Sequence, residues 1–465
     1  MSETAAAPLS EPTPKPEPAA PRDYHFPHFE RKTLPNGIQL VVATVTKLPL
    51  VTVLALVEGG ASVEPADRRG VAALTARLLL EGAGGMDGVA LADRFERIGS
   101  SVEAHADWDV ASVSLTTMSN RLPDALALVR DLLRTPTFPE REVQRLKEER
   151  LADLLQQLAE PRGLADEQFA HALYDSAARY AAPEQGDAAS VRALTRDDVQ
   201  QFHAARYQPA GTTLVFAGDV TMESASSLAA SLFGDWTGGR PSEAPKGIDA
   251  VRKGKGVRVV SKTEAPQSEL RVGHRGLPRN TPDYFDVVVM NAVLGGLFSS
   301  RINLNLREEH GYTYGASSAF DWRRGTGPFV VQTAVKSDVT GAAVQEILGE
   351  IERIRTTAIA EDELTLATSY LDGVFPIRYE TTSAIASALA NMVIHDLPED
   401  YYDQYRAHVR GVTTAGVLRA AQQHLHPDEL RIVVVGDPAA VAAAVEAVTG
   451  VVPEIITGEG DEVPA

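Results

Sequence analysis

The sequence predicts an α+β protein built from two homologous domains, and three observations support this class. The chain has 465 residues, 44% of them hydrophobic, which is enough to bury the cores of at least two domains. Segments with the spacing of strands and of amphipathic helices alternate along both halves. Both halves also close with similar segments, YQPAGTTLVFAGD at 207–219 and LHPDELRIVVVGDP at 425–438. An internal duplication of about two hundred residues is the simplest explanation.

We expect the first domain to occupy residues 28–236. Its strand-like segments, which alternate or are rich in β-branched residues, are 31–34, 38–43, 50–58, 110–118 and 207–219. The turn Pro35-Asn36-Gly37 predicts that the first two strands form a hairpin. Its segments with helical spacing are 70–81, 121–134 and 140–158. Together these elements predict a mostly antiparallel sheet packed with helices.

A second domain of the same kind is expected at residues 257–450, after a linker at 237–256 that is rich in Gly, Pro and Lys. Its strand-like segments are 257–260, 268–274, 329–335 and 425–438, and its helical segments are 284–294 and 344–355. The two ends lack apolar periodicity. Residues 1–27 are crowded with Pro, Ala and acidic side chains and are interpreted as a disordered tether. Residues 451–465 are interpreted as a tail.

Composition excludes several classes of function. Lys and Arg number 44 against 63 Asp and Glu, and the net charge of −19 disfavours binding to nucleic acid or to anionic lipid. The absence of cysteine removes disulfides, thiolate metal sites and thiol nucleophiles, and leaves the compartment open. No window of about twenty uninterrupted apolar residues is present, so we expect a soluble protein without a membrane span.

The stretch Gly295–Gly315 combines a helix, its stop signal and two polar groups at a fixed spacing. Gly311 stands where a left-handed C-terminal cap belongs. The apolar side of the helix is expected to come from Phe298, Ile302, Leu304 and Leu306. Arg307 and Tyr314 lie seven residues apart across the helix-to-strand corner, so a guanidinium and a phenol hydroxyl are able to converge on one carbonyl oxygen. In the alternative interpretation, Arg307 pairs with a neighbouring acid and Tyr314 fills the core.

From Phe29 to about Gly450 the chain resembles the pitrilysin and insulinase type of inverzincin metallopeptidase, in its form with two homologous domains per polypeptide. In that family an early helix carries His-x-x-Glu-His. Its two imidazoles bind one zinc ion, its Glu activates the metal-bound water, and a distant Glu completes the ligand set. The resemblance implies that the two domains form one half of a clamshell.

This sequence departs from the family pattern at the zinc motif. Aligning GVAALTARLLLEG with the motif places Ala73 and Arg77 at the two histidine positions and Ala76 at the general base. The distant ligand is expected at residues 154–156, where no carboxylate occurs. The nearest carboxylates are those of Glu148, Glu149 and Glu160. We therefore expect no metal ion and no other cofactor in this chain.

The second domain, by contrast, keeps the family's Arg and Tyr, seven residues apart, as Arg307 and Tyr314. The resemblance implies that both donate hydrogen bonds to the scissile carbonyl at a zinc site in the other half of the closed molecule. In the bacterial two-subunit branch of the family, a chain with this pair associates with a homologous chain that bears the zinc motif. The resemblance thus implies a non-catalytic subunit of a heterodimeric zinc metallopeptidase, acting on peptides in an enclosed chamber. Either the bacterial cytoplasm or the periplasm is compatible.

A second hypothesis is a structural or binding protein that kept the fold and lost catalysis, as in the core subunits of respiratory cytochrome reductase. Fold alone does not fix function. Such a protein is expected to form homodimers or to join a larger assembly. The feature that separates the two hypotheses is the retained pair Arg307 and Tyr314, for which a scaffold has no chemical need.

Overall fold

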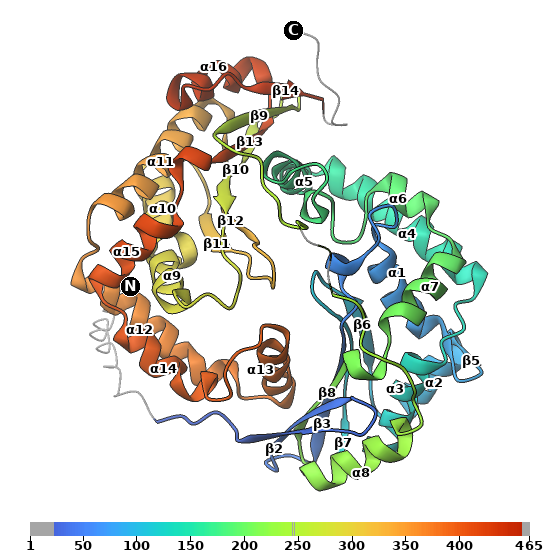
Figure 1. The fold of residues 1–465 in the computed structure, drawn as a ribbon. Coiled ribbons are helices and arrows are strands. Elements are labelled where there is room, and N and C mark those ends of the chain that lie inside the picture. Colours follow the sequence, from blue (N-terminus) through green and yellow to red (C-terminus); the bar gives the residue numbers. More distant parts are fainter. Residues whose placement is uncertain (1–22, 244, 246, 458–465) are drawn as a thin grey trace, which may run out of the picture.

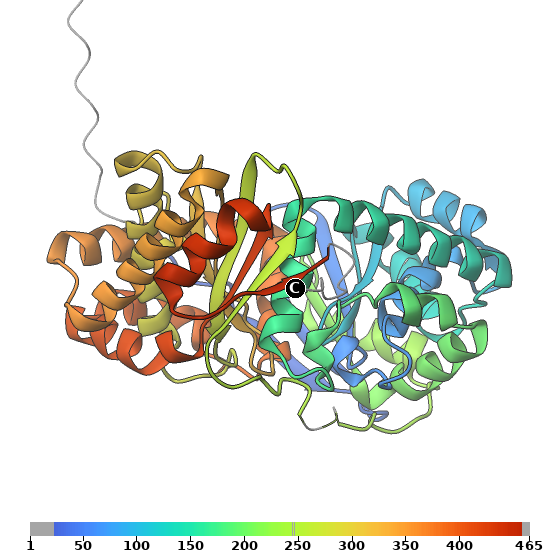
Figure 2. The same ribbon diagram turned by 90° about the horizontal axis from the view of Figure 1, so that it is seen from above.

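The computed structural model describes residues 23–243, 245 and 247–457. It contains one six-stranded sheet in each half of the chain, and a two-stranded sheet in the first half. Helices form much of the outer layer, and the two halves lie side by side and curve around a central region (Figures 1 and 2).

The first sheet has the strand order β1-β2-β8-β3-β7-β6, and all its neighbours are antiparallel except the parallel pair β2–β8. Its strands are β1 (Phe29–Thr33), β2 (Gln39–Thr44), β3 (Leu50–Val57), β6 (Val102–Ala106), β7 (Ala111–Met118) and β8 (Thr212–Gly218). The helices of this half are α1 (Val71–Leu78), α2 (Gly88–Arg97), α3 (Leu122–Arg134), α4 (Glu140–Ala159), α5 (Pro161–Leu173), α6 (Ala188–Ala193), α7 (Arg196–Arg206) and α8 (Met222–Phe233). Short β4 (Gly82–Ala83) and β5 (Met86–Asp87) form the two-stranded sheet.

The second sheet has the order β11-β12-β10-β13-β9-β14, with β13, β9 and β14 parallel to one another. Its strands are β9 (Gly256–Ser261), β10 (Gln267–Arg275), β11 (Ala316–Phe320), β12 (Pro328–Lys336), β13 (Arg431–Gly436) and β14 (Glu454–Ile456). The helices of this half are α9 (Tyr284–Asn291), α10 (Arg301–Asn303), α11 (Thr340–Thr356), α12 (Glu361–Arg378), α13 (Thr382–Ile394), α14 (Tyr401–Gly411), α15 (Thr414–His424) and α16 (Pro438–Thr449).

The two halves repeat the same succession of elements. The order β8-β3-β7-β6 in the first sheet corresponds to β13-β10-β12-β11 in the second, and α3 to α8 correspond to α11 to α16 along the chain. The parallel pair β2–β8 likewise corresponds to β9–β13. The predicted α+β class, with two homologous domains and mostly antiparallel sheets, is therefore confirmed.

One helix of each half packs against the sheet of the other half. Helix α5 packs on β10 and β13 of the second sheet, and α13 packs on β3 and β8 of the first. The Oγ1 atoms of Thr52 in β3 and Thr382 in α13 are 2.9 Å apart and share a hydrogen bond. Because apolar side chains of both halves are buried in these contacts, the hydrophobic effect holds the two halves together as one unit.

The two ends of the chain differ in part from their predicted interpretations. Residues 1–22 of the predicted tether lie outside the described part of the chain. Within 23–27, however, Phe26 is 6% exposed and stacks on Tyr402 at 4.6 Å between ring centroids, so the prediction of disorder is wrong there. In the predicted tail, Glu454–Ile456 pair with β9 as strand β14. A single aromatic residue and a three-residue strand are both too short to produce a periodic signal.

The helix predicted at 284–294 continues further than expected. After α9 the backbone forms the π-helix η6 (Ala292–Gly296), and α10 leads into a second π-helix, η7 (Leu304–Glu309). The run Tyr284–Glu309 is long and apolar enough to cross a membrane by length and composition, and in the part of the chain that is described it is alone in this. Most of this run is buried inside the second half. It is therefore the core helix of that half in this structure.

Buried histidines predict how stability depends on pH. Burial lowers the pKa of His274 to about 3 and the pKa values of His203 and His395 to about 4. These values lie below the usual value of about 6.5, so the folded state resists protonation that the unfolded state accepts. These histidines therefore cost the folded state nothing above about pH 6.5. As the pH falls towards 4, the free energy of unfolding decreases, because the unfolded state gains protons that the buried imidazoles do not accept. We expect the urea midpoint to decrease between about pH 7 and pH 5.

The substitution His395→Gln isolates one of these contributions. The Nδ1 atom of His395 is buried and has no hydrogen-bond partner, so the variant removes a titrating group without removing a bond at that atom. We expect its urea midpoint to decrease less steeply with acid than that of the wild type. Equal slopes for the two proteins would contradict this assignment.

Candidate functional site

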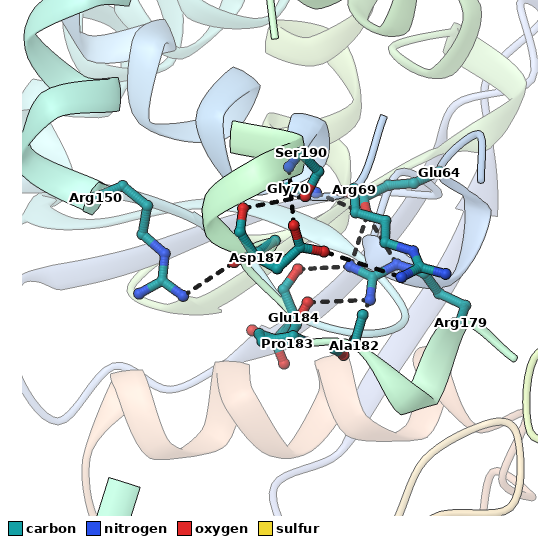
Figure 3. Close-up of polar contacts among 11 residues, drawn as sticks. Glu64, Arg69, Gly70, Arg150, Arg179, Ala182, Pro183, Glu184, Asp187 and Ser190 are labelled. Carbon is teal, nitrogen blue, oxygen red and sulfur yellow. Dashed lines mark hydrogen bonds and ion pairs between the residues drawn. The ribbon is translucent and has the colours of Figure 1, made fainter. Parts of the chain in front are cut away.

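Helix α1 carries the positions that correspond to the zinc motif, and a buried ion pair fixes its start (Figure 3). The Oε1 atom of Glu64 accepts a hydrogen bond from the amide of Ala72 at 2.8 Å, and Oε2 accepts one from the amide of Gly70 at 3.1 Å. The carboxylate thus satisfies amides that the first turn leaves unpaired. Gly70 has φ of 89°, a left-handed conformation that favours glycine.

Arg179 completes this buried pair. Its Nε and Nη2 atoms donate to Oε2 of Glu64 at 2.9 and 2.7 Å, and the remaining donors reach the carbonyl groups of Ala182, Pro183 and Glu184. The side chains of Glu64 and Arg179 are 0% and 5% exposed. The start of α1 is therefore held by a fully satisfied charged network rather than by a metal ion.

The residues at the motif positions themselves do not fit a zinc ion. Ala73 and Ala76 have no donor atoms, and Arg77 pairs with Glu149 of α4 at 2.6 Å. The cavity beside Ala73 and Arg77 is about 20 Å³ in volume, about enough for one water molecule. No carboxylate lines it, and across the described ranges no group of three or more His, Asp or Glu side chains is arranged to hold a metal ion.

Helix α4 presents cations to this cavity near the segment in which the family pattern predicts a ligand. Leu146, Lys147 and Arg150 line the cavity, one to two turns before the predicted ligand segment 154–156. The Nζ atom of Lys147 is buried and donates to backbone carbonyls, including that of Arg192 at 3.1 Å. Positive charges at this place oppose a divalent cation electrostatically. The replacement of the zinc motif therefore extends beyond α1.

Arg307 and Tyr314 lie on the second half and are accessible. Tyr314 is 94% exposed, so the part of the alternative in which Tyr314 fills the core is wrong, whereas the part in which Arg307 pairs with a neighbouring acid agrees with its contact to Glu308. Arg307 is 35% exposed and forms only a loose ion pair with Glu308, at 3.5 Å. Its guanidinium carbon lies 4.6 Å from the centroid of the Phe298 ring, within the range of a cation–π contact. Both donors are free to reach an external group.

The predicted apolar side of this segment is half correct. Ile302 and Leu306 are buried, but Phe298 is 73% and Leu304 40% exposed. Phe298 lies in the turn 297–300 before α10, outside the helix, and at Leu304 the segment changes from α-helix to π-helix, which changes the directions of the side chains from there on. The C-terminal stop is confirmed, since Gly311 has φ of 63°.

The structure does not bring the two predicted sets of residues together. Ala73, Ala76 and Arg77 belong to the first half, whereas Arg307 and Tyr314 belong to the second. No hydrogen bond or ion pair joins the two sets within the described residues. In the described part of this chain, Arg307 and Tyr314 are therefore not joined to the motif positions.

A large cleft between the halves is a feature that the sequence interpretation missed. Its volume is about 740 Å³, and it lies between the first sheet, α13 and the segment that follows β11. Strand β6 forms one edge of the sheet and, among the residues that the structure describes, pairs only with β7, which leaves its other edge unpaired there. An unpaired edge is able to accept an extended peptide as an added strand.

Acidic side chains dominate the charged lining of this cleft. The carboxylates are Glu103, Asp107, Asp109, Glu184 and Asp321. Burial, together with repulsion from Asp107, raises the pKa of Glu184 to about 7. The one guanidinium is that of Arg323, which bonds Asp321 and lies between the rings of Trp108 and Tyr180 at 4.3 and 4.4 Å. The cleft is therefore electrostatically suited to positively charged rather than negatively charged groups.

Comparisons with known proteins place these features in a family. Residues 41–180 match the family described as Insulinase (Peptidase family M16), and residues 193–371 match the Peptidase M16 inactive domain. Together the two matches cover more than half of the chain. The chain belongs to peptidase family M16. The first match includes α1 with its replaced motif, and the second includes Arg307 and Tyr314 of this M16 protein.

The relatives agree with this assignment. An uncharacterized zinc protease of Mycobacterium tuberculosis is 25% identical over 361 residues, which cover 77% of this chain and 82% of that protein. The probable mitochondrial-processing peptidase subunit beta of Arabidopsis thaliana is 21% identical over 425 residues, which cover 88% and 78%.

Solved structures share the fold of this M16 chain. The crystal structure of a peptidase M16 inactive domain from Pseudomonas fluorescens has a TM-score of 0.83 and 26% identity, and covers 89% of this chain and 99% of that one. A chain of Complex III2 from Candida albicans has a TM-score of 0.73 and 15% identity, and covers 88% and 95%. The latter likeness concerns the fold alone.

Metal analysis tests whether the residues at the zinc-motif positions bind zinc. We expect the purified chain, dialysed against buffer without chelator, to carry far less than one equivalent of zinc, because alanines and cations stand at the ligand positions. Inductively coupled plasma mass spectrometry measures this, with a family member that has the intact motif as the positive control. One tightly bound equivalent in this chain would contradict the alignment of α1.

Proposed function

We propose that this M16 protein is the non-catalytic subunit of a heterodimeric zinc metallopeptidase and supplies Arg307 and Tyr314 to the active site of its partner. The observation that carries the proposal is an asymmetry. The two hydrogen-bond donors are present and exposed, whereas alanines and cations replace the residues that would hold the metal ion. Donors of this kind act only beside a group that activates the scissile bond, so a second chain is needed.

The chemistry of the two side chains suits this role. A guanidinium is always charged, and a phenol donates one hydrogen bond, so both stabilise negative charge on a carbonyl oxygen during attack by water. Zinc bound to the partner supplies the activated water and polarises the carbonyl. Arg307 and Tyr314 contribute only the stabilisation of the oxyanion, each by about 3 kcal/mol if they act as donors of this kind usually do.

The assembly in this proposal consists of two homologous chains around one chamber. One relative is by name a subunit beta of a processing peptidase, and a fold neighbour belongs to Complex III2, so similar chains function within larger assemblies. The cleft between the halves of this chain, with its unpaired β6 edge and acidic lining, would form part of the chamber wall. Peptides are the substrate class that such an edge favours.

Co-expression tests the proposal. This chain is produced alone, together with an M16 protein of the same organism that has the intact zinc motif, and that partner is produced alone. We expect the two chains to co-purify, and peptidase turnover to require both. Full activity of the partner alone, unchanged when this chain is added, would defeat the proposal.

A second candidate function is a scaffold without any role in catalysis. The observation that favours it is the likeness to a chain of Complex III2, at a TM-score of 0.73. In this case we expect a stable homodimer in size-exclusion chromatography with light scattering, and no gain of activity with any zinc-bearing partner. Exposed Arg307 and Tyr314 would then have no chemical use, and for this reason we favour the first proposal.

A further inference from the structure

One outward side of helix α12 is apolar. Leu366, Tyr370 and Ile377 are 51%, 53% and 71% exposed. Their spacings of four and seven residues place them within about 40° of one another around the helix axis. Gly373, which shares this side, is exposed as well. A surface helix of a globular protein normally carries charged or polar residues on its outward side. We therefore expect another surface to cover this apolar stripe.

The first half of the chain offers an internal comparison. Helix α4 holds the place in the first half that α12 holds in the second, directly after α3 and α11. Leu155 is the only large hydrophobic side chain of α4 that is exposed, and charged or amide side chains dominate the rest of its exposed surface. The repeated fold therefore does not require an apolar outer side at this place, and the stripe on α12 needs a separate reason.

The stripe adjoins the segment that carries Arg307 and Tyr314. Arg301, the first residue of α10, binds Glu363 in the first turn of α12 through two hydrogen bonds of 2.6 and 2.7 Å. The exposed large hydrophobic side chains of these two neighbouring segments are Phe298, Leu304, Tyr314, Leu366, Tyr370 and Ile377. They are six of the eleven such side chains in the described ranges, so exposed apolar surface is concentrated here.

The apolar side chains of this surface would supply a substantial part of a subunit interface. A large aromatic side chain buries about 150–250 Å² when it is covered, so three aromatic and three aliphatic side chains account for several hundred Å². One partner in a standard protein interface buries about 800 Å². The exposed acids beside these residues are Glu308, Glu309, Glu361 and Asp362, and they outnumber the exposed cation Arg378 beside Ile377. A matching surface is therefore apolar at its centre and basic at its rim.

We propose that this surface, the α12 stripe with the neighbouring Phe298, Leu304 and Tyr314, docks the zinc-bearing partner subunit. The inference rests on the proposed function, because the docking partner is the subunit whose active site Tyr314 is proposed to complete. A second copy of this chain brings no metal to Tyr314 and adds its own acidic rim to this one. Residues 1–22 contain one leucine and no aromatic residue, too little apolar surface to cover six large side chains.

The test compares matched surface variants of the whole chain. The double substitution Leu366→Asp and Tyr370→Asp places charge on the stripe without disturbing the core, and Leu155→Asp makes the same change on the equivalent helix α4, where Leu155 is 70% exposed. Binding to the immobilised zinc-bearing M16 protein is measured by biolayer interferometry. We expect the stripe variant to raise the Kd about tenfold or more, and the control to stay within about twofold of the wild type.

Two turnover measurements distinguish failure of the docking surface from failure of the proposed function. With saturating stripe variant, turnover of the pair should return to the wild-type value, because the donors are intact. The Arg307→Ala chain should bind the partner normally and lower the turnover of the pair. Normal turnover with this variant would contradict the proposed function but not the docking surface. Two results would overturn the docking surface: an unchanged Kd for the stripe variant, or a stripe variant that loses self-association while its partner binding is unchanged.

Discussion

In the reconstituted pair, Arg307→Ala is expected to lower kcat by about 10²–10³-fold and to change KM little. A donor aimed at a developing oxyanion acts in the transition state and not in the ground state, and removal of one such donor usually costs this much. Arg307 is suited to the role because it has only a loose ion pair with Glu308, at 3.5 Å, and keeps donors free. Initial rates with a fluorogenic peptide at saturating subunit concentration measure the effect.

Tyr314→Phe should have an effect of the same kind, since it removes only the hydroxyl from a side chain that is 94% exposed. The matched control is Arg353→Ala, which removes an equally charged and 61% exposed side chain from α11 in the same half. We expect the control to retain wild-type rates. Unchanged kcat in both test variants, or an effect on KM alone, would show that neither residue stabilises the transition state.

The largest expected effect on stability comes from the buried pair under helix α1. Arg179→Ala leaves the carboxylate of Glu64 buried without its cationic partner, and loss of one member of a buried ion pair typically costs about 3–5 kcal/mol. The two side chains are 5% and 0% exposed, and Glu64 also holds the amides of Gly70 and Ala72. We therefore expect a clear decrease in the guanidinium midpoint, seen by circular dichroism.

Arg77→Ala is the control for this measurement. Its ion pair with Glu149 is of similar length, 2.6 Å, but the two side chains are 37% and 44% exposed. Exposed pairs contribute about 0–1 kcal/mol, so the midpoint should scarcely change. Equal decreases for Arg77→Ala and Arg179→Ala would mean that the Glu64 network does not fix the start of α1.

Much of the fold follows from local patterns that the sequence displays. The hairpin at Pro35-Asn36-Gly37, strand β3 and helices α3 and α4 are found close to their predicted bounds. The duplication was visible because strands β8 and β13 lie in similar segments that close the two halves. Such elements are determined by side-chain periodicity and turn residues that are near in sequence.

The features that sequence patterns could not predict depend on contacts between distant segments. The exchange of α5 and α13 between the halves, and the cleft beside β6, arise only when the two sheets come together. Phe298 is exposed because it lies in the turn 297–300, outside the helix that its apolar spacing predicts. Replacement of the zinc motif by alanines was visible in the sequence, but the cations of α4 beside them were not.

The most direct test of the central claim is a titration of this chain into its zinc-loaded partner at fixed concentration, with peptide hydrolysis as the readout. We predict that activity rises from near zero to a plateau at one equivalent, and that a chain with both Arg307→Ala and Tyr314→Phe reaches no comparable plateau although it binds. Activity that is already complete without this chain, or that the doubly substituted chain restores in full, would contradict the claim that it supplies these two donors.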